Sequence, residues 1–275
     1  MKFFFILTML FANSVANSQL RSNNAILSVK YNFSYITDTL FRNKVYSEKM
    51  ILFFNNSQSK FLSYDKMIED STELVKMDSM MQTGKIGYTG QKKNRIPTII
   101  HKFFNSDTLN ILQEYLTKFF LVKNIQPPVK WEIQSDKKNI LGYICQKAQC
   151  FLKGRNYEVW FANQIPIAAG PWKLSGLPGI ILEAKDAKAE VVFLCTEIAQ
   201  INYSNDLLKI PSQVNITTRK ELDEIIEYYT NNPIEALKAV IGDNDFSVKI
   251  ASSSSKIPSK RVVKKPNNPI ELSEN

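Results

Sequence analysis

Apolar and polar residues alternate most cleanly near the start of the folded region. Between residues 27 and 35, apolar or aromatic side chains occupy every second position, with serine, lysine and asparagine between them. A period of two is typical of a strand with one buried and one solvated face. Apolar runs at 46–54 and 59–64 flank the turn-like sequence Asn55-Asn56-Ser57, so we predict an N-terminal antiparallel meander.

The centre of the chain contains the clearest hairpin. We predict a long strand over Ile140–Leu152 and its partner over Tyr157–Ala162. Between them, Gly154 permits the positive φ that a tight turn requires. Residues 180–184 and 191–201 continue the strand pattern, joined by a polar turn.

Three segments before the centre have weaker patterns. Residues 66–81 lack strict alternation and are compatible with a short helix or an ordered loop, whereas 98–104 resembles a strand. Residues 109–122 fit both the helical and the strand period, and Phe119, Phe120 and Val122 favour a strand.

Helices are predicted only at the C-terminal end. Thr218 and Glu221 have the spacing of a capping box, which begins a helix over 219–229. Pro233 begins a second helix that reaches Ile241. Residues 246–275 are expected to form a disordered basic tail, because the core-forming pattern is lost there.

These elements predict a mainly β fold in one domain over residues 19–245. Strands with one apolar face suit a sheet that is packed on one side and solvated on the other. We therefore expect a single strongly curved antiparallel sheet, or an open half-barrel, with two C-terminal helices and a disordered tail.

Residues 1–18 have the features of a secretory signal peptide. Lys2 precedes an apolar run at 3–12, which is about half the length of a membrane-spanning helix. Ala16 and Ser18 supply the small residues of a cleavage site. No cysteine lies nearby for a lipid anchor, and no later segment has 18 consecutive apolar residues. We expect export to the periplasm or medium, with no transmembrane segment after cleavage.

Composition narrows the classes of partner. The 275 residues carry a formal net charge of +9, and 44% of them are apolar, as in globular domains large enough to bury a core. The sequence lacks the interleaved basic and aromatic residues that are typical of nucleic-acid binding, and an exported protein would rarely meet nucleic acid. One histidine and three cysteines disfavour a zinc site. We predict no metal, no cofactor and no nucleic acid.

The cysteines allow at most one disulfide. If 140–152 is a strand, Cys145 and Cys150 lie about 17 Å apart, too far for a bridge. Only Cys195 could pair with Cys145 or Cys150, and three buried thiols are the alternative.

Catalytic chemistry has little support in the residue supply. His101 is the only imidazole base, and Ser175 lacks the flanking glycines of a nucleophile elbow. Two of the carboxylates near the centre could form an acid/base pair, although carboxylates are common on strand surfaces. The four candidates are Glu132, Glu158, Glu183 and Asp186. We predict a non-enzymatic protein.

A glycine- and proline-rich segment interrupts the strands. It contains Gly170-Pro171 and then Gly176-Leu177-Pro178-Gly179-Ile180-Ile181, and the chain nearly ends on Asn268-Pro269-Ile270-Glu271-Leu272. With the preceding run from Gly142 to Ile167, these motifs closely resemble the GLPGLI family, most strongly over 131–185. The resemblance implies an exported protein of the Bacteroidota envelope and implies no activity.

The rigid segment suggests a binding site at one end of a curved sheet. We expect a non-enzymatic binding or carrier protein whose apolar cleft takes a lipid or another apolar ligand. The expected contact residues are Trp160, Phe161, Trp172, Leu177 and Arg155. The alternative is a module that docks on an outer-membrane protein, through this segment or by lending residues 268–272.

Overall fold

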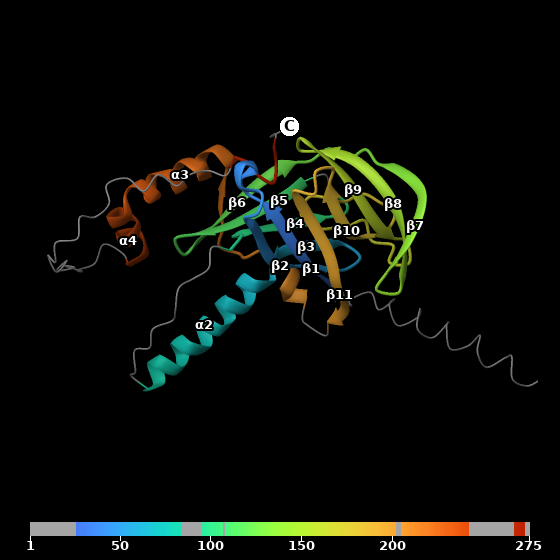
Figure 1. The fold of residues 1–275 in the computed structure, drawn as a ribbon. Helices are drawn as coiled ribbons and strands as arrows, with labels where there is room; N and C mark the ends of the chain where they lie inside the picture. The colour runs from blue at the N-terminus through green and yellow to red at the C-terminus, as the bar shows by residue number, and fades with distance from the viewer. Residues whose placement is uncertain (1–25, 84–94, 107, 202–204, 242–266, 273–275) are drawn as a thin grey trace, which may run out of the picture.

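A computed structural model describes residues 26–83, 95–106, 108–201, 205–241 and 267–272 (Figure 1). In this part of the chain, twelve strands form one sheet in the order β12-β6-β5-β4-β3-β2-β1-β11-β10-β9-β8-β7. The strands are β1 (Ile26–Ile36), β2 (Val45–Phe54), β3 (Gln58–Ser63), β4 (Thr98–Phe103), β5 (Thr108–Tyr115), β6 (Lys118–Ile125), β7 (Glu132–Ile140), β8 (Tyr143–Leu152), β9 (Arg155–Ala162), β10 (Ile180–Asp186), β11 (Val191–Ile201) and β12 (Asn215–Thr217). The sheet is open, with β12 and β7 at its edges. The predicted fold class is confirmed.

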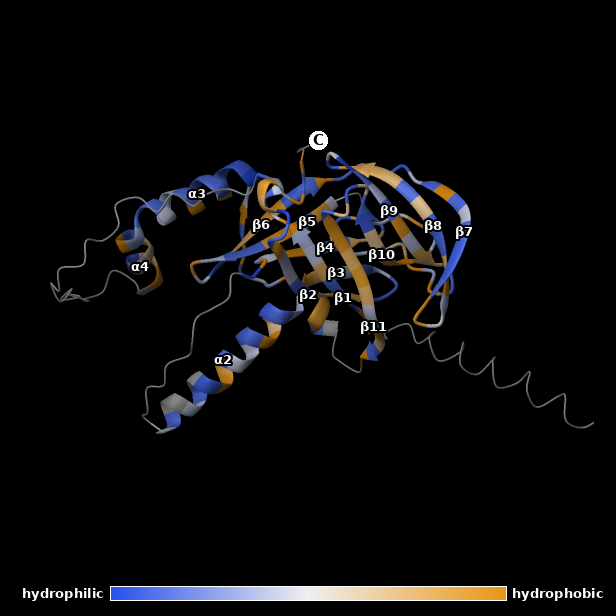
Figure 2. Cartoon of the chain, viewed as in Figure 1, coloured by the Kyte–Doolittle hydropathy of each residue, from blue (hydrophilic) through white to orange (hydrophobic). Residues whose placement is uncertain are grey.

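The N-terminal strand β1 lies in the middle of the sheet. It pairs antiparallel with β2 on one side and with β11 on the other. Its alternating residues Val29, Tyr31 and Phe33 are buried in the main core. Figure 2 shows the same alternation as hydrophobic and hydrophilic bands along the strands. The period of two therefore identified the buried face correctly.

One predicted strand is in fact a hairpin, and a second begins later than predicted. The segment 109–122 contains a turn at Leu116 and Thr117, where φ is 46° and 66°, so β5 and β6 pair with each other. The turn has neither glycine nor asparagine, the residues that usually mark positive φ. The strand predicted over 140–152 is β8 and begins at Tyr143, because Leu141 and Gly142 form the turn between β7 and β8. Gly154 has the positive φ that we predicted.

Three α-helices lie in the described residues. The segment left open between helix and loop forms α2 (Tyr64–Thr83), which follows β3 directly. Both C-terminal helices are confirmed as α3 (Arg219–Asn231) and α4 (Pro233–Ile241), and both hydrogen bonds of the predicted capping box are present. Helix α3 is held beside β5, because the Tyr115 hydroxyl donates to the Ile226 carbonyl oxygen. No helix among the described residues is long and apolar enough to cross a bilayer.

The inner face of the sheet is filled by the chain between β9 and β10. This signature loop, residues 163–179, contributes Ala169, Leu174 and Leu177 to the same core as the inner residues of β1 to β5. The Tyr31 hydroxyl donates to the Ile181 carbonyl oxygen across that core, at 2.7 Å. The loop is therefore a structural part of the domain.

The end of the chain differs from the predicted disordered tail. Residues 267–272, called the C-terminal segment below, lie against the domain (Figure 1). Asn268 is only 3% exposed and donates to the Ile36 carbonyl oxygen at 2.6 Å. Polar side chains bind this segment, so a pattern of apolar residues could not reveal it. The rest of the predicted tail up to residue 266, and the predicted signal peptide, lie outside the described residues.

Candidate functional site

The signature loop has a conformation that depends on its glycines. A Cβ on Gly179 would overlap the carbonyl group of Ala162 on β9, and one on Gly170 would lie 2.8 Å from the Ile181 side chain. Trp172 has a φ of 55°, a left-handed conformation that non-glycine residues seldom adopt. Strain of this kind persists only where the surroundings fix it.

Hydrogen bonds from strand β4 and from the connection between β6 and β7 hold the loop in place. The Trp131 indole Nε1 donates to the Ser175 carbonyl oxygen at 3.0 Å. Gln126 Nε2 donates to the Lys173 carbonyl oxygen at 2.9 Å. Lys102 Nζ, on β4, donates to the Ser175 hydroxyl at 2.8 Å. The loop at residues 173 and 175 is therefore held by bonds that do not involve the Trp172 or Lys173 side chain.

A cavity of about 720 Å³ lies beside the loop. Its lining combines aromatic rings with charged and amide side chains from eight separate parts of the chain. The lining residues are Tyr35, Thr98, Ile111, Asn124, Ile125, Lys153, Trp172, Lys173, Arg219, Asp223, Pro269, Ile270, Glu271 and Leu272. Its size falls within the range of small-molecule sites.

Helix α3 supplies one wall of this cavity. The capping box at Thr218 places Arg219 and Asp223 in the first turns of the helix, where they form an ion pair at 2.7 Å. Arg219 Nη1 also donates to Gln113 Oε1 on β5, at 3.3 Å. These charged groups therefore line the same cavity as Trp172 and Lys173 of the signature loop.

Arg155 holds the C-terminal segment that forms the remaining wall. This side chain is 3% exposed, and its guanidinium donates to Asn268 Oδ1 at 2.6 Å and to the Pro269 carbonyl oxygen at 2.7 Å. Its Nε donates to the Ile270 carbonyl oxygen at 2.9 Å. Arg155 thus binds the protein's own chain and has a structural role at this position.

Two carboxylates balance the charge of Arg155. Its Nη1 lies 2.6 Å from Asp186 and 3.3 Å from Glu190, both almost fully buried. Burial alone would raise the pKa of Glu190, but its bonds to Arg42 and Arg155 outweigh that effect and lower the pKa below its usual value. The buried charges therefore form one compensated cluster under the C-terminal segment.

The expected apolar cleft is not formed by the residues that we predicted. Phe161 and Leu177 are buried in the core, at 0% and 1% exposure. Trp160 points to the opposite face of β9 from Phe161, and the Lys138 ammonium lies 4.4 Å from its ring centroid. Of the five predicted contact residues, only Trp172 lines the cavity. Large apolar side chains fill the core first, so their presence did not indicate a cleft.

The only histidine is placed away from this cavity. His101 is 1% exposed and lies opposite Lys60 on β3, on the other face of β4 from the core residue Ile100. Burial and the positive charge of Lys60 lower its pKa to about 3. It is therefore neutral at physiological pH and separated from the cavity by the sheet.

The other catalytic candidates have structural roles. Ser175 and Lys102 resemble a serine–lysine pair, but the space beside them is about 10 Å³, which is room for about one water molecule. Three of the four carboxylates form ion pairs on or near the strands: Glu158 with Lys147 and Lys185, Glu183 with Lys138, and Asp186 with Arg155. Glu132 is exposed. Among the described residues, no three metal-ligating side chains form a cluster.

All three cysteines are free thiols, so the possible bridge from Cys195 to Cys145 or Cys150 is not formed. Cys145 and Cys150 lie on β8 and Cys195 lies on β11, with β9 and β10 between them in the sheet. Burial raises the pKa of Cys145 to about 11 and that of Cys150 to about 12. The alternative of three thiols within the fold is the one observed.

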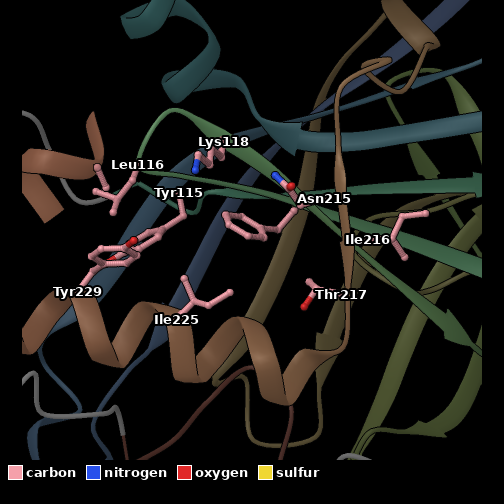
Figure 3. Close-up of a pocket in the computed structure, with 10 residues that line it drawn as sticks. Tyr115, Leu116, Lys118, Asn215, Ile216, Thr217, Ile225 and Tyr229 are labelled. Carbon is pink, nitrogen blue, oxygen red and sulfur yellow. The ribbon is translucent and has the colours of Figure 1, made fainter. Parts of the chain in front are cut away.

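A second, smaller pocket of about 330 Å³ lies between α3 and β5, β6 and β12. Figure 3 shows Ile225 and Tyr229 rising from α3 toward Tyr115. The two tyrosine ring centroids are 6.4 Å apart. This pocket involves none of the residues of the signature loop.

The sequence matches a family of known proteins over part of its length. The matching family model is described as "N-glycanase peptide, N-terminal domain". It covers residues 109–226, less than half of the chain. No curated protein matches the chain.

The solved structures of PNGF-II share the fold. PNGF-II, in two crystal forms, superposes with a TM-score of 0.52 at 14% sequence identity. The similarity covers 75% of this chain but only 34% and 33% of the PNGF-II chains, so this chain spans about a third of their length. A DUF1329 family protein from Desulfovibrio piger has a TM-score of 0.33 at 8% identity, over 74% of this chain and 96% of its own.

Sequence reasoning missed most of the cavity. Asn124, Lys173 and the α3 pair Arg219 and Asp223 come from three separate segments, and no local motif connects these segments. The one available signal was the position of Lys173 within the signature loop, next to Trp172.

Proposed function

We propose that this chain is a non-enzymatic binding domain that takes a saccharide in the 720 Å³ cavity beside the signature loop. The observation that carries the proposal is the lining of that cavity, which joins the rings of Trp172 and Tyr35 to donors and acceptors on every side. A sugar offers a C–H face that packs on an aromatic ring, and hydroxyls that both donate and accept hydrogen bonds.

The charged lining favours a polar ligand over the lipid that the sequence suggested. Arg219 and Lys173 provide donors, and Asp223 and Glu271 provide acceptors. An acyl chain would remove these groups from water without offering them hydrogen bonds, which is costly. Saccharide hydroxyls would replace the lost water contacts.

The matching family model is described as "N-glycanase peptide, N-terminal domain", and this description supports a role in glycan recognition. The shared fold with PNGF-II extends the likeness beyond the matched residues, although it concerns a third of that protein. We also propose that the chain belongs to the GLPGLI family and is exported, as its signature motifs and first eighteen residues suggest.

The proposal is tested by titrating the full chain with N,N′-diacetylchitobiose, the core disaccharide of N-glycans, in a calorimeter. We expect binding that Trp172→Ala abolishes, because the ring forms the cavity wall. Tyr229→Ala, in the second pocket, is the matched aromatic control and should bind like the unaltered chain. Loss of binding in the Tyr229 variant with retention in the Trp172 variant would refute this site, and so would an absence of binding to this sugar and to larger N-glycan cores.

A further inference from the structure

The C-terminal segment places a carboxylate on the two donors of the signature loop. Glu271 Oε1 accepts a hydrogen bond from the Trp172 indole Nε1 at 2.8 Å. The Lys173 ammonium lies 2.6 Å from Oε1 and 2.9 Å from Oε2 of the same carboxylate. The Lys173 side chain is 8% exposed, so this is a partly desolvated, charge-assisted contact.

The backbone that carries the two donors is held independently of Glu271. The loop carbonyl groups of residues 173 and 175 accept bonds from Gln126 and Trp131, and the Leu174 amide donates back to the Pro171 carbonyl oxygen. Removing the carboxylate would leave the Lys173 ammonium and the Trp172 indole N–H at the cavity lining without this acceptor. A buried ammonium without an anion is unfavourable, so the position favours another anion.

The C-terminal segment is attached more firmly before Glu271 than after it. Asn268 is buried, and Arg155 captures residues 268, 269 and 270 through side-chain and main-chain oxygens. Beyond Ile270, the described contacts are the Glu271 carboxylate and one bond from the Leu272 amide to the Lys153 carbonyl oxygen. Glu271 can therefore leave the donors while Arg155 keeps the rest of the segment bound.

We infer that Trp172 and Lys173 form a receptor for the carboxylate of an acidic saccharide, and that Glu271 occupies this receptor when no ligand is bound. The inference rests on the proposed function, because the same cavity holds the sugar. Trp172, Lys173 and Glu271 all line that cavity, so a ligand there reaches both donors. An acidic sugar displaces Glu271, whereas a neutral sugar leaves it in place.

The receptor itself is tested in the full chain without any sugar. The indole N–H signal of Trp172 is followed in ¹H–¹⁵N spectra and assigned by its loss in Trp172→Phe. We expect Glu271→Ala to move this signal upfield, and sodium acetate to move it back, whereas acetamide and sodium chloride do not. Glu235→Ala, which removes a carboxylate paired with Lys238 on α4, is the control and should leave the signal unchanged. An acetate-insensitive signal in a folded Glu271→Ala protein overturns the receptor.

The competition is tested with glucuronate and glucose, which differ in the carboxylate. Glucuronate should bind Glu271→Ala roughly tenfold more tightly than the unaltered chain, as expected when one charge-assisted contact no longer has to be displaced. Glucose should bind both proteins equally. Equal glucuronate affinities would overturn the competition. If acetate restores the signal and no saccharide binds, the saccharide function fails while the carboxylate receptor stands. If saccharides bind and acetate has no effect, the saccharide function stands and the carboxylate receptor fails.

Discussion

Replacing Arg155, a buried arginine at the start of β9, should strongly destabilise the domain. The guanidinium is 3% exposed and makes five hydrogen bonds, to Asp186, Glu190, Asn268, Pro269 and Ile270. Arg155→Met keeps much of the volume and removes the charge. Two buried carboxylates then lose their shared cation, and three oxygens of the C-terminal segment lose their donor.

The size of the effect follows from burial. Removing one partner of a buried ion pair costs about 3–5 kcal/mol, because the other charge stays uncompensated. Arg42 offers a matched control, since it contacts the same Glu190 at 2.7 Å but its side chain is 51% exposed. Arg42→Met should cost no more than about 1 kcal/mol, as for exposed pairs.

The assay is unfolding by guanidinium chloride, followed by tryptophan fluorescence. The pKa of Glu190 is lowered in the folded protein, with burial opposing the shift and the two arginines causing it. Its contribution to stability is therefore present above the unfolded pKa of about 4.3 and is lost as the pH falls through the lower folded value. The difference between the unaltered chain and Arg155→Met should shrink over that acidic range. A cost below about 1 kcal/mol at neutral pH, or equal costs for Arg155→Met and Arg42→Met, would refute the reasoning.

Two further predictions concern the signature loop and the thiols. Gly179→Ala should lower the free energy of unfolding by about 3 kcal/mol or more, because the new Cβ overlaps the backbone of Ala162; Gly142→Ala, with φ 88° and open space around it, should cost about 1 kcal/mol. Similar unfolding midpoints for the two variants would contradict the tight approach of the loop to β9. Cys145 and Cys150 should react with Ellman's reagent at pH 8 only after unfolding, because burial raises both pKa values to about 11 or 12; rapid labelling of either thiol in the native protein would contradict their placement.

Local patterns predicted the elements whose causes are local. Alternation in β1, the capping box at Thr218 and the positive φ at Gly154 each depend on a few neighbouring residues. The turn at Leu116 and Thr117 was missed because neither residue ordinarily favours positive φ. The place of β1 between β2 and β11 depends on pairing across more than 150 residues, which no short pattern contains.

The candidate site was predictable only in part, for a related reason. The glycine- and proline-rich motif correctly indicated a rigid loop, and Trp172 on that loop lines the cavity. Phe161 and Leu177 were expected there because they are apolar, and for that reason they lie in the core. The C-terminal segment meets Arg155 more than 110 residues away in sequence, through bonds that a hydropathy pattern does not show.

The most direct test of the proposed site is a map of where a saccharide binds on the full chain. We would add N,N′-diacetylchitobiose to ¹⁵N-labelled protein and follow the assigned ¹H–¹⁵N signals. The account predicts shifts at the Trp172 indole, Lys173, Asn124 and Arg219, which line the large cavity. Shifts confined to Tyr115, Asn215 and Tyr229, around the second pocket, or no shifts at all at millimolar sugar, would contradict it.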